Sequence, residues 1–402
     1  RHRRHATESD APAVLSVRAR IQGLIAEARA EATPSGALPP VLAEDRPAIE
    51  VERPATPEHG DLAANLAMKL ARPMRRSPMQ IAEALAAAIR QVPAGAALSE
   101  VTVAAPGFLN MRLSTTWLEG VLDEARAAGD AFGRVTQARP LHFNVEFVSA
   151  NPTGPLHVGN ARGAFVGDLL CRVLEGGGHT VTREYYFNDA GAQIRNLGAS
   201  VVARKLGEDI PEDGYHGQYV DELALELPPE VWAAANEPGS DRDGIVADWA
   251  QERVRAGIEE SLERLGVHFD VWKSESSLHT DGWVERSVER LRQDGHIYEE
   301  DGATWFRSTA FGDDKDRVVY RSGGQPTYFA SDIGYVSEKF SRGFDKLIYI
   351  WGADHHGTVA RVRNAAEAMG LDKAAVEMML VAWVRFVRDG VEVPMSKRSG
   401  EF

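Results

Sequence analysis

The sequence contains almost no cysteine, no long apolar run and no excess of positive charge. Cys171 is the only cysteine among 402 residues, so no disulfide can form within the chain, and we interpret its thiol as a small core residue. No apolar run approaches the roughly 18 residues needed to cross a bilayer, so we expect no membrane partner. The absence of disulfides fits a reducing compartment, and we expect a cytoplasmic protein.

The net charge of −14 argues against a protein that coats nucleic acids without specificity. It does not exclude an enzyme that binds one RNA over a restricted surface, because phosphate binding depends on local basic patches. The length suggests two or three domains, and 44% hydrophobic with 26% charged residues is an ordinary globular composition. Residues 1–5 are basic and lack the apolar segment of a secretory signal, so we treat residues 1–12 as a tail outside the fold.

A strand, a turn-rich loop and a helix follow one another in the middle of the chain. Residues 141–148 form a short β-rich run, and residues 161–174 have the apolar periodicity of a helix. The predicted apolar face of that helix consists of Phe165, Leu169, Leu170 and Val173. This order creates an anion site at a helix N-terminus, where the loop delivers His157, Gly159 and Asn160. A buried strand before a capped helix would give the same pattern, so this stretch alone leaves both interpretations open.

Further strands predict a parallel sheet. A second strand at 180–187 completes a β-α-β unit, and apolar runs at 346–351 and 378–387 continue the sheet after a mainly helical stretch. The predicted parts are a small α+β domain at 13–115, a helical linker at 116–139, an α/β domain at 140–402 and a mainly helical insertion in it at about 193–320.

Several short motifs resemble those of one enzyme family. Residues 149–164 read SANPTGPLHVGNARGA and residues 394–400 read PMSKRSG, and together they resemble the HIGH and KMSKS signatures of class I aminoacyl-tRNA synthetases. YFNDAGAQI at 186–194, PEDGYH at 211–216 and GADHHG at 352–357 narrow the resemblance to bacterial arginyl-tRNA synthetases. The words HGDLAANLA and APGFLNMRLS, before residue 115, resemble the N-terminal domain with which these enzymes contact the tRNA elbow. The resemblance runs from about Val14 to Phe402.

The resemblance implies an arginine–tRNA ligase with a Rossmann-like catalytic domain. L-Arginine and ATP would give arginyl-adenylate and pyrophosphate, and arginine would then pass to the terminal ribose of tRNA(Arg). The implied substrates and partners are therefore L-arginine, tRNA(Arg) and ATP, with Mg²⁺ accompanying the ATP. We expect a monomer, and no spacing of histidines and carboxylates indicates a metal site of its own.

The resemblance also implies roles for individual residues. His157, Asn160 and Lys397 would be catalytic. ATP would be bound by His157, Gly159, Asn160, Gly352, Asp354, His355, Met395, Ser396 and Lys397. L-Arginine would be bound by Glu146, Ser149, Asn151, Glu275, Tyr328 and Asp332. Chemistry supports carboxylates in the last set, because a guanidinium is planar, permanently charged and rich in hydrogen-bond donors.

The chain departs from the family pattern at three places. Asn160 stands where the first signature often has histidine, and Pro394 stands where the second has its first lysine. Family members continue with a helical anticodon-binding domain that we expect to be absent here, and we expect weak activity from this chain alone. Two alternatives stay open: a degenerate synthetase that binds tRNA or ATP without catalysis, and another adenylyl transferase with the same nucleotide-binding fold.

Overall fold

The computed structural model describes residues 16–382, 384–388 and 391–393, with the backbone alone at positions 354, 356, 386, 388 and 391–393. The chain divides between Gln137 and Ala138 into two compact units. Within the described residues, no helix has the length and apolar character that crossing a membrane requires.

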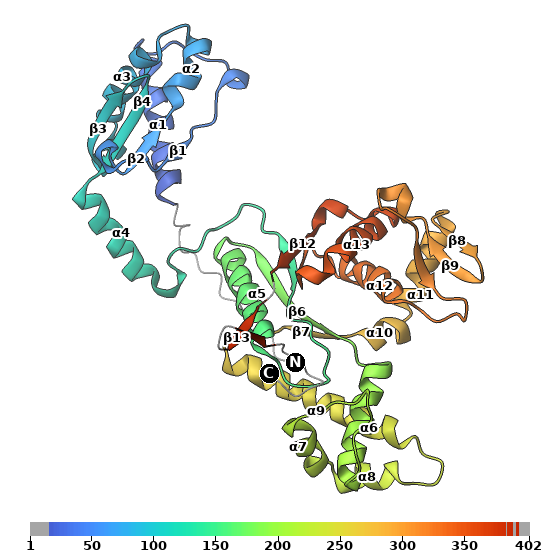
Figure 1. The fold of residues 1–402 in the computed structure, drawn as a ribbon. Coiled ribbons are helices and arrows are strands. Elements are labelled where there is room, and N and C mark those ends of the chain that lie inside the picture. Colours follow the sequence, from blue (N-terminus) through green and yellow to red (C-terminus); the bar gives the residue numbers. More distant parts are fainter. Residues whose placement is uncertain (1–15, 383, 389–390, 394–402) are drawn as a thin grey trace, which may run out of the picture. The chain divides into compact units, whose positions relative to one another are not determined.

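The N-terminal unit is a four-stranded antiparallel sheet, in the order β1-β2-β4-β3, packed against α1, α2 and α3 (Figure 1). Its elements are α1 Val17–Ala32, β1 Val51–Glu52, β2 Leu62–Ala64, α2 Leu66–Met74, α3 Pro78–Ile89, β3 Leu98–Ala104, β4 Phe108–Leu113 and α4 Thr115–Ala128. Helix α3 begins at a serine and a proline: the Ser77 hydroxyl accepts a hydrogen bond from the Gln80 amide at 3.3 Å, and Pro78 takes the first helical position. An ion pair of 2.5 Å between Arg20 and Glu124 ties α4 to α1.

The C-terminal unit is built on a five-stranded parallel sheet in the order β12-β11-β5-β6-β7. The strands are β5 His142–Glu146, β6 Thr180–Phe187, β7 Val271–Ser274, β11 Lys346–Gly352 and β12 Val376–Val381. Strand β5 has β6 on one side and β11 on the other, so the winding of the chain reverses between β5 and β11. Doubly wound sheets bind ligands at such a point. The predicted α/β class with an α+β N-terminal part is confirmed.

The stretch from 193 to 320, predicted as a helical insertion, forms one helical lobe and the beginning of a second, mixed lobe that continues beyond residue 320 (Figure 1). The first consists of α6 Ala192–Leu206, α7 Gln218–Glu226, α8 Pro229–Ala235 and α9 Arg242–Arg264. The second contains α10 Glu275–Thr280, α11 Trp283–Gln293, a small sheet of β8 Ile297–Glu300, β9 Ala303–Phe306 and β10 Arg317–Tyr320, and then α12 Tyr328–Ser341 and α13 His356–Ala368. Strand β7 lies between the lobes and belongs to the main sheet. A hairpin of β13 Phe386–Arg388 and β14 Val391–Val393 follows β12.

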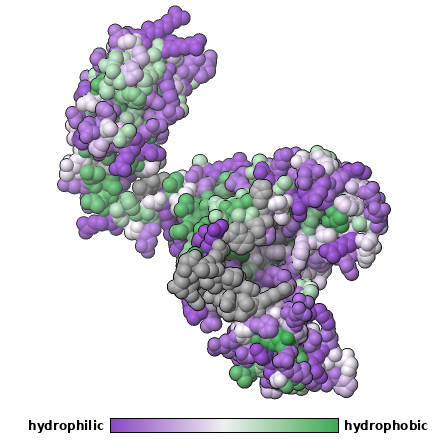
Figure 2. Space-filling view, in the orientation of Figure 1, coloured by the Kyte–Doolittle hydropathy of each residue, from purple (hydrophilic) through white to green (hydrophobic). Residues whose placement is uncertain are grey.

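Helix α5, Val158–Gly176, packs Leu170 of its predicted apolar face against the core together with small residues such as Gly167, but the other three residues of that face are exposed. Phe165, Leu169 and Val173 are 46%, 61% and 69% exposed, and Figure 2 shows hydrophobic residues gathered over this helix. A β-carbon at Gly167 would lie 2.2 Å from the Phe147 ring, so only glycine permits this approach of helix to strand. The interpretation of Cys171 as a core residue is confirmed, since it is fully buried and burial raises the pKa of its thiol to about 12.

Candidate active site

A cavity of about 580 Å³ lies at the carboxyl ends of β5 and β11, where the winding reverses. Glu146, the last residue of β5, and Gly352, the last of β11, both line it. The second lobe adds Glu275 from α10 and Asp332 from α12. The topology therefore marks this cavity as the candidate active site before any side chain is considered.

Two carboxylates face this cavity without an ion pair to lysine or arginine among the described residues. Burial raises the pKa of Asp332 to about 7, and the charges of Glu275 and Glu146 add to the shift. Burial also raises the pKa of Glu275, although the Ser331 hydroxyl donates a hydrogen bond of 3.0 Å to it. Buried acids that repel one another are stabilised by a cation, so the cavity favours a positively charged ligand.

If the ligand is the L-arginine that the motifs imply, its affinity is expected to fall as the pH falls through about 7, the pKa of Asp332. A bound guanidinium stabilises the ionised carboxylate, so binding releases a proton wherever the free carboxyl is protonated. Calorimetry in buffers of different ionisation enthalpy should show release of nearly one proton per arginine at about pH 6, and much less at about pH 8. Asp332→Asn should abolish the release, and a release that persists in this variant would mean that another group titrates.

The raised pKa of Asp332 has the opposite effect on the ligand-free protein. The folded state holds this proton more tightly than the unfolded chain does. The group therefore stabilises the fold at low pH and loses that contribution as the pH rises through about 7. Ligand affinity and intrinsic stability thus change in opposite directions across the same pH range.

Glu275 is held at the cavity by the residues on either side of it. Asp189, which follows β6, accepts hydrogen bonds from the Ser274 hydroxyl at 2.5 Å, the Ser276 hydroxyl at 2.7 Å and the Ser276 amide at 2.9 Å. The Ser274 hydroxyl also caps α10 by accepting from the Ser277 amide at 3.2 Å. The start of α10 is therefore fixed to the end of β6, which determines where the Glu275 carboxylate lies.

The loop after β5 has a strained backbone at two residues without glycine. Val148 and Ser149 have φ values of 66° and 44°, a region that side chains with a β-carbon rarely adopt. Hydrogen bonds hold this conformation: the Ser149 hydroxyl accepts from the Tyr186 amide at 3.2 Å and donates to Glu146 at 3.3 Å. Backbone strain maintained by specific hydrogen bonds is typical of functional loops, and here it turns Ser149 towards the cavity.

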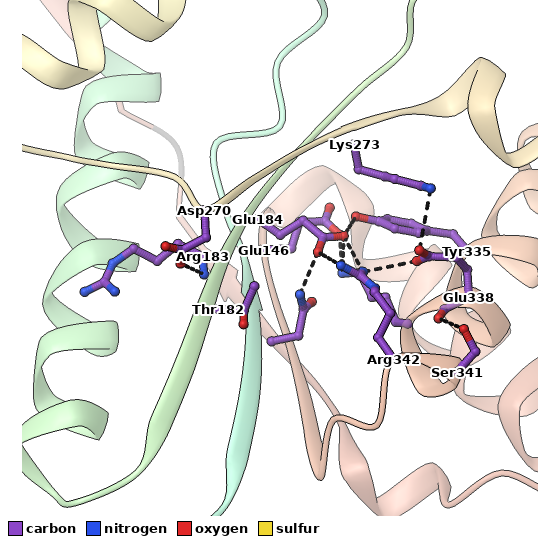
Figure 3. Close-up of polar contacts among 12 residues, drawn as sticks. Glu146, Thr182, Arg183, Glu184, Asp270, Lys273, Tyr335, Glu338, Ser341 and Arg342 are labelled. Atoms are coloured by element: carbon purple, nitrogen blue, oxygen red, sulfur yellow. Dashed lines mark hydrogen bonds and ion pairs between the residues drawn. The ribbon is translucent and has the colours of Figure 1, made fainter. Parts of the chain in front are cut away.

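A network of buried charges lies beneath the cavity (Figure 3). The fully buried Lys339 ammonium is 2.7 Å from Glu146, and it lies 4.4 Å and 3.9 Å from the ring centres of Tyr335 and Tyr349. Glu184 accepts two hydrogen bonds from Arg342, at 2.7 and 2.9 Å, and a further one from the Tyr335 hydroxyl. Burial opposes ionisation of Glu184, but Lys339 and Arg342 outweigh it and lower its pKa to about 2.

This network balances its own charge. Glu338 completes it through ion pairs with Lys273 at 3.5 Å and with Arg342 at 3.1 Å, contacts that Figure 3 also draws. Within the described residues it joins three acids, Glu146, Glu184 and Glu338, to three bases, Lys273, Lys339 and Arg342. The charge of Glu146 is thus balanced by Lys339. Glu275 and Asp332 are therefore the cavity carboxylates that need a cation.

The residues predicted to bind phosphate lie at the start of α5. The Asn160 side chain accepts a hydrogen bond from the His157 backbone amide at 3.1 Å, so Asn160 caps the helix that it begins. A β-carbon at Gly159 would lie 3.9 Å from that of Val384, and Arg162 donates a hydrogen bond to the Ala382 carbonyl. The start of α5 therefore adjoins the segment that leads towards residues 394–400.

The cavity brings together all the residues predicted to bind arginine: Glu146, Ser149, Asn151, Glu275, Tyr328 and Asp332. Gly352 and His355 of the predicted ATP set also line it. His157, Gly159 and Asn160 lie at the start of α5, outside this lining. The Asp354 side chain and all of Met395, Ser396 and Lys397 are outside the described residues. The individual binding roles stay predictions.

Tyr186, Tyr335 and Arg361 are among the lining residues that the sequence did not predict. The rings of Tyr186 and Tyr335 stack with their centres 4.6 Å apart and form one wall of the cavity. Both tyrosines could have been predicted from the sequence. Tyr186 is the first residue of the motif at 186–194, and Tyr335 lies about one helical turn after Asp332. Arg361 follows the motif at 352–357 by four residues, and nothing in its local pattern distinguishes it from a surface arginine.

The described side chains contain no group of three or more histidine, cysteine, aspartate or glutamate residues that could hold a metal ion. The side chains of Asp354 and His356 are outside that search, because only their backbone is described. The prediction that the chain has no metal site of its own therefore stays a prediction.

Comparison with known proteins agrees with the motifs. The family model for the arginyl-tRNA synthetase N-terminal domain matches residues 19–113, and the model for the class I (R) tRNA synthetase catalytic domain matches residues 133–213 and 242–402. An arginine–tRNA ligase from Bacillus licheniformis is 45% identical over 368 residues, which cover 90% of this chain and 66% of the relative. One from Desulforudis audaxviator is 47% identical over 363 residues, which cover 89% and 64%.

The fold agrees with a solved structure as well. Thermus thermophilus arginyl-tRNA synthetase matches with a TM-score of 0.61 at 22% identity, over 91% of this chain and 66% of that one. The chain thus spans only 64–66% of the length of the relatives named here. Both family models match in the order of the two units, and the catalytic model alone covers more than half of the chain. The chain therefore belongs to the class I arginyl-tRNA synthetase family.

Proposed function

We propose that this protein is the part of an arginine–tRNA ligase that activates L-arginine and transfers it to tRNA(Arg). The arginine carboxylate attacks the α-phosphorus of ATP, which gives arginyl-adenylate and pyrophosphate. A hydroxyl of the terminal tRNA ribose then attacks the adenylate carbonyl and releases AMP. Neither step needs a covalent enzyme nucleophile, so the protein supplies alignment and charge stabilisation, with Mg²⁺ accompanying the ATP.

The observation that carries this proposal is the pair of cavity carboxylates, Glu275 and Asp332, that form no ion pair with lysine or arginine among the described residues. A guanidinium offers five hydrogen-bond donors and a permanent charge, which suits two acids and a tyrosine such as Tyr328. A neutral ligand would leave both half-buried carboxylates uncompensated. The charge of the cavity therefore supports arginine as the amino acid.

The N-terminal unit is the part that we propose contacts tRNA. It carries a hollow of about 440 Å³ whose lining includes Arg53, His59, Phe108 and Asn110, and Phe108 is 37% exposed. An exposed aromatic ring beside amide and basic groups suits an unpaired base, which stacks on the ring and bonds through its edge. Exposed arginines at the end of α2 are candidate phosphate contacts: Arg72, Arg75 and Arg76.

The decisive experiment is exchange of labelled pyrophosphate into ATP. We expect exchange that requires both L-arginine and tRNA(Arg), because tRNA-dependent activation is what the family resemblance implies. Exchange supported by a different carboxylate would favour another adenylyl transferase. Binding of tRNA or ATP with no exchange under any condition would favour the non-catalytic relative.

Lys397→Ala is expected to lower the turnover of adenylate formation by about 10²–10³-fold while changing arginine affinity by less than about twofold. The proposed role of Lys397 is to stabilise charge on the departing pyrophosphate, an interaction made only as the bond breaks. Rapid-quench measurement of adenylate formation, with calorimetry for arginine, separates the two quantities. Lys315→Ala, at an exposed position, is the matched control. Equal losses of turnover and affinity would contradict the assigned role.

A further inference from the structure

Arg361 is a cation of the cavity without a partner among the described residues. It lies on α13, and Thr358 and Val362 of the same helix also line the cavity. Its side chain is half-buried, and its Nε atom is buried and makes no hydrogen bond. A buried guanidinium N–H without an acceptor is unfavourable, so its presence here calls for an anion that arrives with the ligand.

The neighbouring acids do not serve as that anion. The positive charge of Arg361 lowers the pKa of Asp332 against the larger opposite effect of burial, so the two groups are within electrostatic reach. No ion pair joins them, and Glu146 is already paired with Lys339 at 2.7 Å. In the described structure, Arg361 is therefore near acids of the cavity and bonded to none of them.

The charges of the cavity mirror those of one amino acid. Two acids, Glu275 and Asp332, and one base, Arg361, line it without ion pairs among the described residues. Zwitterionic L-arginine carries two positive groups, the guanidinium and the α-ammonium, and one negative group, the α-carboxylate. Binding of this one molecule would give every unpaired charge a partner and leave the filled cavity neutral.

We infer that Arg361 binds the α-carboxylate of L-arginine. The inference rests on the proposed function, because it takes arginine as the ligand of the cavity. A guanidinium that holds one carboxylate oxygen leaves the other free to attack the α-phosphorus of ATP, so Arg361 orients the nucleophile. The triphosphate of ATP is a poorer match, since Glu275 and Asp332 would repel its several negative charges.

L-Argininamide separates the carboxylate from the rest of the ligand, because it keeps the side chain and amino group but lacks the negative charge. We expect the wild-type protein to bind L-arginine about 10–100-fold more tightly than L-argininamide in calorimetry at about pH 8. In Arg361→Gln the arginine affinity should fall by that factor, while argininamide affinity should change by less than about threefold. The variant therefore loses its preference between the two ligands.

Two further variants make this test specific. Arg363→Gln removes an exposed arginine of the same helix and should keep the wild-type preference. Arg361→Lys keeps the charge but replaces the fixed plane of directed guanidinium N–H groups with a compact ammonium, so its preference should lie between those of the wild type and Arg361→Gln. If Arg361→Gln does not fold, as judged by circular dichroism, an unchanged preference in Arg361→Lys contradicts the inference.

The outcomes distinguish this inference from the function on which it rests. A wild-type protein that does not bind L-arginine would contradict the proposed function, and the inference with it. A wild type that prefers arginine, with the same preference in Arg361→Gln, would contradict the inference alone. Unchanged arginine binding with weakened binding of a non-hydrolysable ATP analogue in Arg361→Gln would assign the residue to the nucleotide instead.

Discussion

Asp332→Asn is expected to raise the L-arginine concentration needed for half-saturation by about a hundredfold to a thousandfold. Asparagine keeps the shape of the side chain but removes a charge that we propose pairs with the buried guanidinium. The same change should stabilise the ligand-free protein above about pH 7, since a buried carboxyl with a pKa of about 7 no longer has to ionise there. Lower affinity together with higher stability is the behaviour of a residue retained for binding.

This prediction is checked by calorimetric titration with L-arginine and by thermal unfolding at about pH 8. Asp294→Asn makes the same chemical change at an exposed position at the end of α11, and it should alter neither quantity. An arginine affinity in Asp332→Asn equal to that of the wild type would remove Asp332 from the binding site. A large loss of stability would mean that its carboxylate is mainly structural.

Lys339→Met is expected to lower the free energy of unfolding of the C-terminal unit by about 3–5 kcal/mol. The lysine ammonium is fully buried 2.7 Å from a Glu146 carboxylate that is almost fully buried itself, so neither charge is screened by water. Methionine preserves most of the side-chain volume, which keeps the packing loss small. The variant therefore leaves the buried Glu146 carboxylate, which lines the cavity, without its counter-charge.

A double variant separates charge from packing. Lys339→Met combined with Glu146→Gln removes both members of the pair, and it should recover most of the stability lost in Lys339→Met alone. Lys346→Met is the control, because its side chain is partly exposed and its carboxylate partner Glu377 lies 3.9 Å away, a pair of little energetic value. Urea unfolding of the four proteins measures these differences. No recovery in the double variant would contradict the charge-balance account.

Local sequence patterns predicted the elements whose causes are local. The β-rich run and the turn-rich loop before α5 predicted β5 and its loop, and Ser77 followed by Pro78 is a local pattern from which the start of α3 can be predicted. Tyr328 and Asp332 are four residues apart, a spacing that puts both on one face of a helix, and both line the cavity from α12. These features depend on residues a few positions apart, which a linear pattern contains.

Burial could not be predicted where it depends on how elements meet. Lys339 is fully buried because α12 places it against Glu146 of β5, although a lysine near a helix end normally faces water. Phe165 and Leu169 are exposed because α5 packs on the core through a different face, which includes Gly167 and Leu170. Strand β7 has only four residues, too few to show an alternating pattern.

The structure explains how asparagine can stand at position 160, where the family signature often has histidine. Its side chain caps α5 by accepting from the His157 amide at 3.1 Å, a role that needs a hydrogen-bond acceptor and no proton transfer. Asparagine performs this role well, so the start of the helix is formed without the histidine of the family signature. A catalytic role for Asn160 stays a prediction, as does the effect of Pro394, which lies outside the described residues.

The claim that this cavity is a carboxylate site for arginine is tested most directly by calorimetric binding of L-arginine, L-lysine and L-citrulline. Citrulline keeps the shape of arginine and lacks its positive charge, whereas lysine keeps a charge without the planar fork. The account predicts that arginine binds and that citrulline binds at least about a hundredfold more weakly, with lysine also weaker than arginine. Equal binding of all three ligands, or of arginine and citrulline, by the folded protein would contradict it.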